Sequence, residues 1–342
     1  MKQRLLYIDV LRGIAILTVV YSHILLFCVG YSETSSMTDL LRKYFLNAFF
    51  FLSGFMVYKA PMQNPTPILH ELWKKVKLLL IPTLISGGLC CIYVHGNFLS
   101  YLADGAKGGY WFTIVLFIMM VIYAIEKSCI KWIKNEYAQS IVLLLVAIGA
   151  YCCKNMMLAI AWTNYLCLYS VSYYFLMFTI GVLCKKHVDL FHHFLGISWV
   201  KTCIFLIAMV GSLVGYVPLL ITCMAVVLLV YFLVRDICTS DLNDNNLKVN
   251  DASYKQWIYR TLQVIGQNTI EIYFLHYFLL FKIPLGVVSF THSMYEVGTV
   301  ANSSIVEIAI YGTISVCIAL VCIAIRKILA HVPYVSTIMF GK

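Results

Sequence analysis

The chain has 342 residues, of which 62% are hydrophobic and only 12% are charged. A soluble globular protein carries about 25% charged residues to cover its surface, so this composition excludes a soluble enzyme, a disordered chain and a nucleic-acid-binding domain. The net charge of +10 does not indicate a nucleic-acid partner, because Lys and Arg collect in the cytoplasmic loops of membrane proteins. The composition predicts an all-α, polytopic membrane protein.

Apolar runs of spanning length recur along the whole chain, separated by short polar stretches. We expect a bundle of about ten transmembrane helices, forming a single domain over residues 1–342 without an appended soluble domain. The first run is long, carries a histidine and lacks a small-residue cleavage site, so it predicts a retained helix and not a signal peptide. The expected segments are 5–29, 43–59, 78–95, 110–125, 138–153, 165–184, 202–217, 218–234, 261–281 and 305–325.

The distribution of Lys and Arg predicts the orientation of the bundle. Ten helices place both termini on one side of the membrane. With the N-terminus in the cytoplasm, 19 Lys and Arg residues fall on the cytoplasmic side and 5 on the other. This asymmetry supports ten helices and cytoplasmic termini. The longest polar stretch on the cytoplasmic side, 235–260, is rich in Asp and Asn and predicts a flexible loop.

A polar stripe runs along the first predicted helix. A charge inside the bilayer costs at least ~2.5 kcal/mol, so such residues are functional candidates. At 100° per residue, Asp9, Arg12 and His23 lie within one arc of about 60°, and Arg12 and His23 are about 16 Å apart along the axis. We expect this stripe to face the bundle interior or an aqueous cavity. A packing salt bridge between Asp9 and Arg12, and a histidine bonded to a neighbouring helix, are the structural alternatives.

The ninth segment, 261–281, carries two further ionisable residues. Glu271 and His276 lie about 140° apart around the helix and do not share a face. We therefore expect Glu271 to pair with another helix, with Arg12 as a candidate partner. For His276 a structural or supporting role is as good an interpretation as a catalytic one.

Three lysines, Lys74, Lys75 and Lys77, precede the third segment. They are interpreted either as cytoplasmic anchoring or as a phosphate clamp, and the spacing alone favours anchoring. The sequence has none of the common nucleotide, metalloprotease or serine-hydrolase motifs, and the 13 cysteines show no zinc spacing. We expect no metal.

The motifs of the chain, taken together and in order, resemble those of the integral-membrane acyltransferase family three. The mark of that family is an Arg, ten residues and a His on the first helix, which here are Arg12 and His23. The resemblance extends over nearly the whole chain. Its other motifs are FFFLSGFMVY (Phe49–Tyr58), LIP (Leu80–Pro82), YWF (Tyr110–Phe112) and GQNTIEIYFLH (Gly266–His276).

One motif departs from the family pattern. Many members have an Arg-x-x-Arg element before the proline of the third helix, where this chain has Lys74 and Lys77, followed by Leu78. Lysine is a point charge and not a bidentate fork, so a different hold on the donor phosphates is expected.

The resemblance implies an O-acyltransferase that takes an acyl group from cytoplasmic acyl-CoA and transfers it to an envelope or secreted carbohydrate. Acetyl is the expected group, and succinyl and other short acyl groups stay open. His23 would act as general base, and Asp9 would orient Arg12; an acyl-histidine intermediate also stays open. Arg12, the three lysines and Trp111 would hold the CoA end. The ninth segment would supply supporting residues, namely Glu271, Tyr273 and His276.

The implied setting is a lipid bilayer, the bacterial cytoplasmic (inner) membrane, with acyl-CoA and a carbohydrate as partners and no nucleic acid. Two other functions fit the same pattern. A transporter or flippase of a glycan precursor or a small solute would use the polar stripe as a substrate path. A structural or sensory membrane protein would use the charged residues only to lock helix packing.

Overall fold

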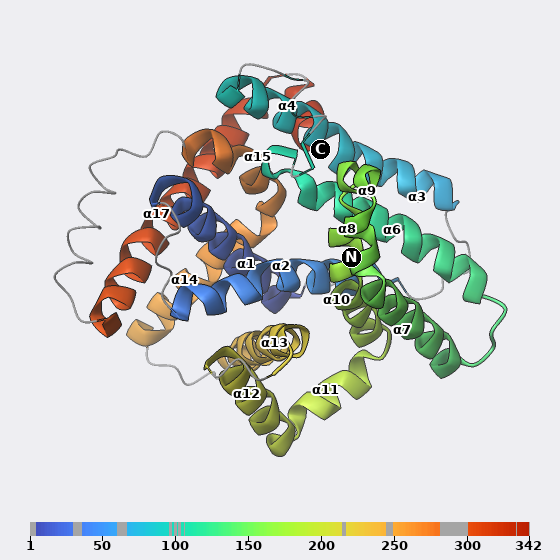
Figure 1. Ribbon diagram of the computed structural model, residues 1–342. Coiled ribbons are helices and arrows are strands. Elements are labelled where there is room, and N and C mark those ends of the chain that lie inside the picture. Colours follow the sequence, from blue (N-terminus) through green and yellow to red (C-terminus); the bar gives the residue numbers. More distant parts are fainter. Residues whose placement is uncertain are drawn as a thin grey trace. The chain divides into compact units, whose positions relative to one another are not determined.

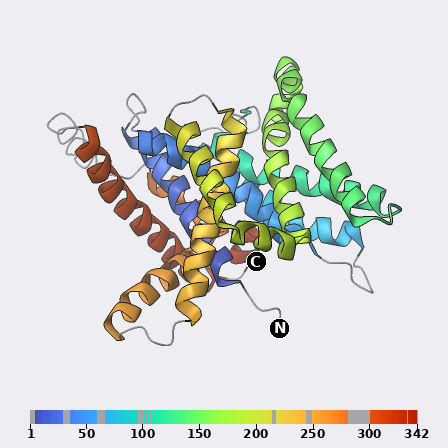
Figure 2. The same cartoon turned by 90° about the horizontal axis from the view of Figure 1, so that it is seen from below.

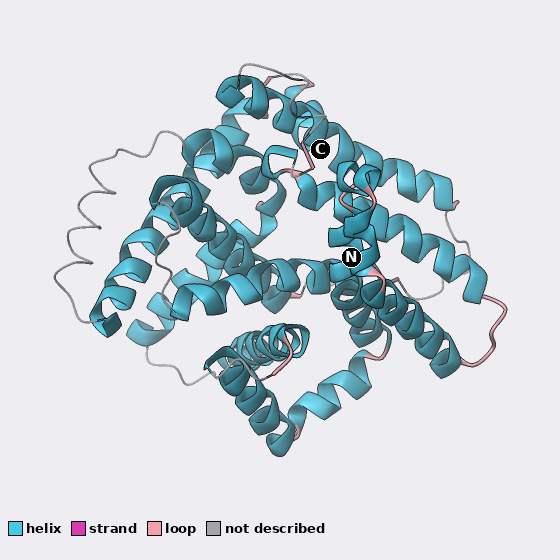
Figure 3. Ribbon diagram, viewed as in Figure 1, coloured by secondary structure: helices cyan, strands magenta, loops and turns pink. Residues whose placement is uncertain are grey.

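The computed structural model describes residues 5–29, 36–59, 67–95, 98, 101, 104–105, 107–213, 217–243, 249–280, 300–332 and 334–341. Every regular element in these ranges is helical, as the composition predicts (Figure 3). The first half contains α1 (Leu6–Ile24), η1 (Leu25–Val29), α2 (Ser36–Val57), α3 (Ile68–Lys75), η2 (Val76–Leu80), α4 (Ile81–His95), η3 (Lys107–Gly109), α6 (Trp111–Ile130), α7 (Glu136–Cys152), α8 (Lys154–Ala159) and α9 (Ala161–Tyr165). The second contains α10 (Leu168–Lys186), α11 (Val188–Gly196), α12 (Ser198–Leu213), α13 (Leu219–Asn243), α14 (Val249–Gln267), α15 (Thr269–Leu280), α17 (Val300–Leu329) and α18 (Val335–Phe340).

Six helical stretches among the described residues are long and apolar enough to cross a membrane: Leu6–Cys28, Ile68–Tyr93, Trp111–Ile130, Leu168–Lys186, Leu219–Thr239 and Ile308–Leu329. The pair Val188–Gly196 and Ser198–Ser212, bent by 84°, makes a seventh if it is one span. Three apolar helices are shorter: Tyr44–Val57, Glu136–Cys152 and Thr269–Leu280. Each segment expected from the sequence overlaps one of these helices, which supports an integral membrane protein.

The helices group into two compact units. The first comprises Met1–Phe49 and His193–Lys327, and the second comprises Phe50–His192 and Ile328–Lys342. In the first unit, α1 packs against α13, α14 and α15, and α12 lies along α13 (Figures 1 and 2). In the second unit, α10 packs against α6 and α7 around buried aromatic side chains such as Phe175 and Phe178. The buried hydroxyls of Thr83 on α4 and Thr113 on α6 lie 2.5 Å apart.

Glycines allow α1 and α14 to approach each other closely. A Cβ atom at Gly266 would overlap the carbonyl oxygen of Asp9, and one at Gly13 would overlap the carbonyl oxygen of Leu262. Small residues at a helix interface let backbones come into direct contact, which is a common way of packing helices within membranes.

We expect Gly266→Ala to destabilise the protein by about 1–3 kcal/mol, because an added methyl group forces the two helices apart. Gly312→Ala on α17 is the matched control, since nothing lies within 4 Å of a Cβ placed there. The melting temperature in detergent checks this prediction: it should fall for Gly266→Ala and stay at the wild-type value for Gly312→Ala. Equal stability of the two variants would contradict it.

The segment expected as one helix over 261–281 is interrupted. The side-chain amide of Asn268 donates to the carbonyl oxygen of Val264 (2.7 Å), and its backbone N–H donates to the carbonyl oxygen of Ile265 (3.1 Å). This short backbone bond ends α14, and a new helix starts when the N–H of Ile272 donates to the carbonyl oxygen of Asn268 (3.1 Å). Asparagine offers the backbone such a local alternative, which an apolar run cannot reveal.

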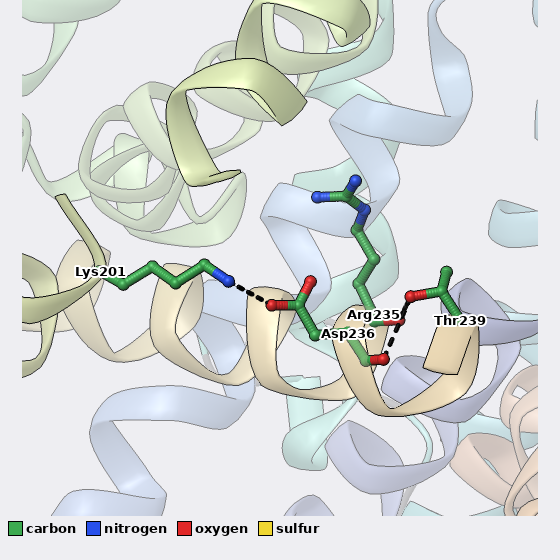
Figure 4. A network of polar contacts seen from close by, with 4 residues as sticks. All are labelled: Lys201, Arg235, Asp236 and Thr239. Atoms are coloured by element: carbon green, nitrogen blue, oxygen red, sulfur yellow. Dashed lines mark hydrogen bonds and ion pairs between the residues drawn. The ribbon is translucent and has the colours of Figure 1, made fainter. Parts of the chain in front are cut away.

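The loop expected over 235–260 is wrong for most of its length. Helix α13 continues to Asn243 and α14 already begins at Val249. The hydroxyl of Thr239 donates to the carbonyl oxygens of Arg235 (2.9 Å) and Asp236 (3.1 Å), and Lys201 of α12 pairs with the carboxylate of Asp236 (Figure 4). The hydroxyl of Thr239 thus bonds back within α13, and the ion pair with Lys201 ties this polar part of the helix to α12, where composition alone indicated turns.

The third predicted segment starts earlier than expected. A helical stretch runs from Ile68 to Tyr93 and includes the π-helix η2, in which the N–H of Ile81 donates to the carbonyl oxygen of Val76. Pro82 has no N–H for the carbonyl of Leu78, and a π-type turn is one way to carry a helix past such a gap. The lysines expected at the mouth of this segment therefore lie within the helix.

Candidate active site

The polar stripe of α1 faces α14 and α15 in the first unit. Arg12 donates to the hydroxyl of Thr269 (2.6 Å), which is the first residue of α15. The side-chain amide of Gln267 donates to the carboxylate of Asp9 (3.2 Å), and Asp9 is buried with 3% of its surface exposed. The short junction between α14 and α15 thus supplies polar partners for two residues of the stripe.

His23, the third residue of the stripe, lies against a second histidine. Its Nδ1 atom is 2.9 Å from Nε2 of His276, and the two rings are nearly parallel, with an interplanar angle of 7°. The other nitrogen of His276, Nδ1, is 2.9 Å from the carbonyl oxygen of Ile272 one turn earlier in α15. His276 is 0% exposed and His23 is half-buried. The structure therefore gives His276 a direct partner on α1, which the helical wheel of its own helix could not supply.

Tyr277 lies beside His23 and is not among the residues that the sequence predicts for the site. Its hydroxyl lies 3.3 Å from Nε2 of His23, and its ring is 4.9 Å from the His23 ring, centre to centre. Only 3% of Tyr277 is exposed. The signal available in the sequence was its place directly after His276, at the end of the last motif. Tyr273, which was expected in a supporting role, packs its ring on Phe274 and near His276, with centroids 5.3 and 6.2 Å away.

Glu271 lies in an ion pair on the side of α15 away from His276. Its Oε1 atom is 3.7 Å from Nε of Arg326 on α17, and the side chain of Glu271 is 0% exposed. A partner on another helix was expected, and Arg326 was not named. A buried carboxylate needs such a charged partner, because desolvation alone would disfavour its ionised form. The pair links the start of α15 to the end of α17.

The remaining expected residues belong to the second unit. Glu71 accepts from Lys59 (3.0 Å) and lies 3.6 Å from Lys74. One carboxylate therefore lies close to two ammonium groups, and the net charge of these three side chains is positive. Lys75 is half-buried, and the amino group of Lys77 lies 5.6 Å from the centre of the Trp73 ring. This arrangement suits both anchoring and the binding of an anion.

Trp111 begins α6 and stacks on Tyr174 of α10. The ring centres are 6.1 Å apart and the interplanar angle is 24°. Tyr174 also stacks on Phe50, with ring centres 4.7 Å apart. The indole of Trp111 is therefore the end of a row of three aromatic rings in the second unit. Trp111 itself is half-buried, so part of its side chain remains exposed.

The comparisons with known proteins identify the family. The model of the acyltransferase domain of acyltransferase family 3 matches residues 5–324. Comparisons with curated proteins and with solved structures found no match. The matched range contains the whole polar stripe of α1. It also contains α15, which carries His276 and Tyr277. Because the match spans nearly the whole chain, the protein is a membrane acyltransferase and belongs to acyltransferase family 3.

Proposed function

We propose that this membrane acyltransferase transfers an acyl group, with acetyl the first expectation, from acyl-CoA to a hydroxyl of an envelope or secreted carbohydrate. The family match supports the reaction class. One observation carries the assignment of the site: a hydroxyl, that of Tyr277, lies 3.3 Å from Nε2 of His23. An acceptor hydroxyl at a similar place would be within reach of a general base.

In the proposed reaction His23 is the general base. Its Nε2 atom takes the proton of the acceptor hydroxyl while the oxygen attacks the thioester carbon of acyl-CoA. The tetrahedral intermediate then collapses, the C–S bond breaks, and the proton passes from His23 to the CoA thiolate. An unperturbed imidazole titrates near neutrality, so it suits both halves of this transfer.

The donor is assigned to the basic residues. Arg12 is proposed to bind phosphate oxygens of CoA as a charge-assisted donor, with Asp9 balancing and orienting it. As the family resemblance implies, Lys74, Lys75 and Lys77 are also proposed to contact the donor as point charges, and Trp111 as an aromatic side chain. The positive-inside distribution supports entry of the donor from the cytoplasm, and the proposed location is the bacterial inner membrane.

The test is a transfer assay in membranes that contain the protein. Acetyl-CoA labelled in the acetyl group is supplied, and label is followed into the glycan and lipid fractions, with protein-free membranes as control. The proposal expects protein-dependent label in a carbohydrate. A parallel reaction with labelled succinyl-CoA tests the other acyl group. Absence of protein-dependent label from both donors would contradict the proposal.

A transporter or flippase of a glycan precursor or a small solute is the second candidate. The break at Asn268 and the 84° bend between α11 and α12 favour it, because transporters often build binding sites from discontinuous helices. This candidate predicts movement of a labelled glycan precursor into proteoliposomes that contain no acyl-CoA. Flux that requires acyl-CoA, or no flux, would exclude it.

A purely structural or sensory role predicts that neutral substitutions at Arg12 and Asp9 disturb folding and not turnover.

A further inference from the structure

A chain of hydrogen bonds runs from the backbone of α15 through two imidazole rings to a hydroxyl. It links the carbonyl oxygen of Ile272 to His276 Nδ1 (2.9 Å), His276 Nε2 to His23 Nδ1 (2.9 Å), and His23 Nε2 to the hydroxyl of Tyr277 (3.3 Å). We propose that His276 is a positioning residue that holds His23 in the tautomer with its proton on Nδ1, so that Nε2 is the basic atom. This inference rests on the proposed role of His23.

The proton positions follow from the first link of the chain. A carbonyl oxygen can only accept, so Nδ1 of His276 must carry the proton in that bond. A neutral imidazole has a single N–H, and a ring that is 0% exposed disfavours the charged form. Nε2 of His276 is therefore an acceptor. The N–H between the two rings must then belong to Nδ1 of His23, and the lone pair of His23 lies on Nε2.

The other tautomer of His23 does not fit this chain of hydrogen bonds. With the proton on Nε2, the lone pair of Nδ1 would point at the lone pair of His276 Nε2 from 2.9 Å. Two acceptors at that distance lose a hydrogen bond and repel each other, and burial removes the water that could bridge them. His276 thus selects one tautomer, as a carboxylate or carbonyl does for the histidine of other catalytic sites.

The same arrangement limits what His276 can do during the reaction. When Nε2 of His23 takes the proton of the acceptor hydroxyl, the Nδ1–H of His23 keeps its bond to His276 and is strengthened by the new charge. The ring of His276 is 0% exposed, and such burial disfavours a charged imidazole at that position, so the new positive charge stays on His23. The proton therefore stays on His23 until it passes to the CoA thiolate, and His276 orients the base without relaying the proton.

Two substitutions at one position test the inference. His276→Phe keeps a planar ring of similar size and removes the acceptor, whereas His276→Gln can place an amide oxygen close to the position of Nε2. We expect His276→Phe to lower kcat about 100-fold, the upper end of the range for loss of a hydrogen bond that orients a metal-bound histidine, with the KM for acyl-CoA unchanged. His276→Gln should recover at least ~10-fold of that loss, since a restored acceptor again selects the tautomer.

The outcomes separate this inference from the proposed function. Equal losses for His276→Phe and His276→Gln in folded protein, or a kcat of His276→Phe within threefold of wild type, would overturn the role of His276. A His23→Ala variant with full activity would overturn the proposed function itself, whatever His276 does. The double variant His23→Ala/His276→Phe should be no slower than His23→Ala, because the two residues act as one unit.

A spectroscopic measurement on the wild-type protein does not depend on the folding of any variant. Nitrogen NMR of protein labelled with ¹⁵N-histidine distinguishes a ring nitrogen that carries a proton from one that carries a lone pair. His23, assigned by its loss in His23→Ala, should show the proton on Nδ1 and the lone pair on Nε2. The opposite pattern would refute the inference.

Discussion

Replacing His23 by alanine is expected to lower kcat by about 10²–10⁴-fold, the range that a positioned general base contributes. The KM for acyl-CoA should change little, because the proposed base contacts the acceptor hydroxyl and not the CoA phosphates. Initial rates of label transfer at saturating acyl-CoA, compared at matched protein amounts, measure this effect.

His187 provides the matched control for His23. It is also half-buried, its Nε2 atom lies 2.9 Å from the hydroxyl of Ser140, and its ring stacks on Tyr137 at 5.4 Å. It therefore shares the local chemistry of His23 but lies in the second unit and has no assigned part in the reaction. His187→Ala should turn over at a rate within about threefold of wild type, a free-energy difference below ~1 kcal/mol. Similar losses for both variants would show that loss of a half-buried imidazole, and not loss of the base, lowers the rate.

Arg12→Ala is expected to raise the KM for acyl-CoA about 10–100-fold, because a charge-assisted hydrogen bond to an anion contributes about 1.5–3 kcal/mol. The sharpest measurement compares two donors. Acetyl-CoA carries the phosphates, and acetyl-pantetheine lacks them. The wild-type protein should prefer acetyl-CoA, and Arg12→Ala should lose most of that preference while its activity with acetyl-pantetheine stays near the wild-type value.

The donor comparison also tests whether Arg12 serves only helix packing. Its hydrogen bond to Thr269 joins α1 to α15, so a loss of structure would lower the activity with both donors equally. Thr269→Val is the control that removes this partner and keeps the guanidinium. It should retain the preference for acetyl-CoA, and loss of the preference in Thr269→Val would argue against a direct contact between Arg12 and the phosphates.

The sequence predicted those parts of the fold that depend on composition and periodicity. Runs of apolar residues indicated the helices, and a 100° rotation per residue placed Asp9, Arg12 and His23 on one stripe before any contact was known. Local backbone chemistry was harder to foresee. At Asn268 the backbone N–H bonds to Ile265 and the side-chain amide bonds to Val264, and the polar end of α13 is tied to α12 by the ion pair of Lys201 with Asp236.

The candidate site was predictable residue by residue but not as an arrangement. His23 and His276 are 253 positions apart in the chain, and a helical wheel describes only one helix at a time. On the wheel of α15, Glu271 and His276 point in different directions, and the structure places them against Arg326 and His23 respectively. The role of Tyr277 depends on the direction of one hydroxyl, which follows from the packing of α15 against α1.

The close contact at Gly13 and Gly266 fixes the position of α1 along its own axis, and also its rotation, relative to α14. A helix that slips by one residue moves about 1.5 Å along its axis and turns by about 100°. Ten residues beyond Gly13, such a slip would swing the imidazole of His23 away from His276. A substitution at Gly13 that still allows folding should therefore behave as a defect in alignment, with slow turnover at a position about 15 Å from the reacting atoms. A screen for inactive variants would then yield substitutions at the glycine contact between α1 and α14 as well as substitutions at His23 and His276.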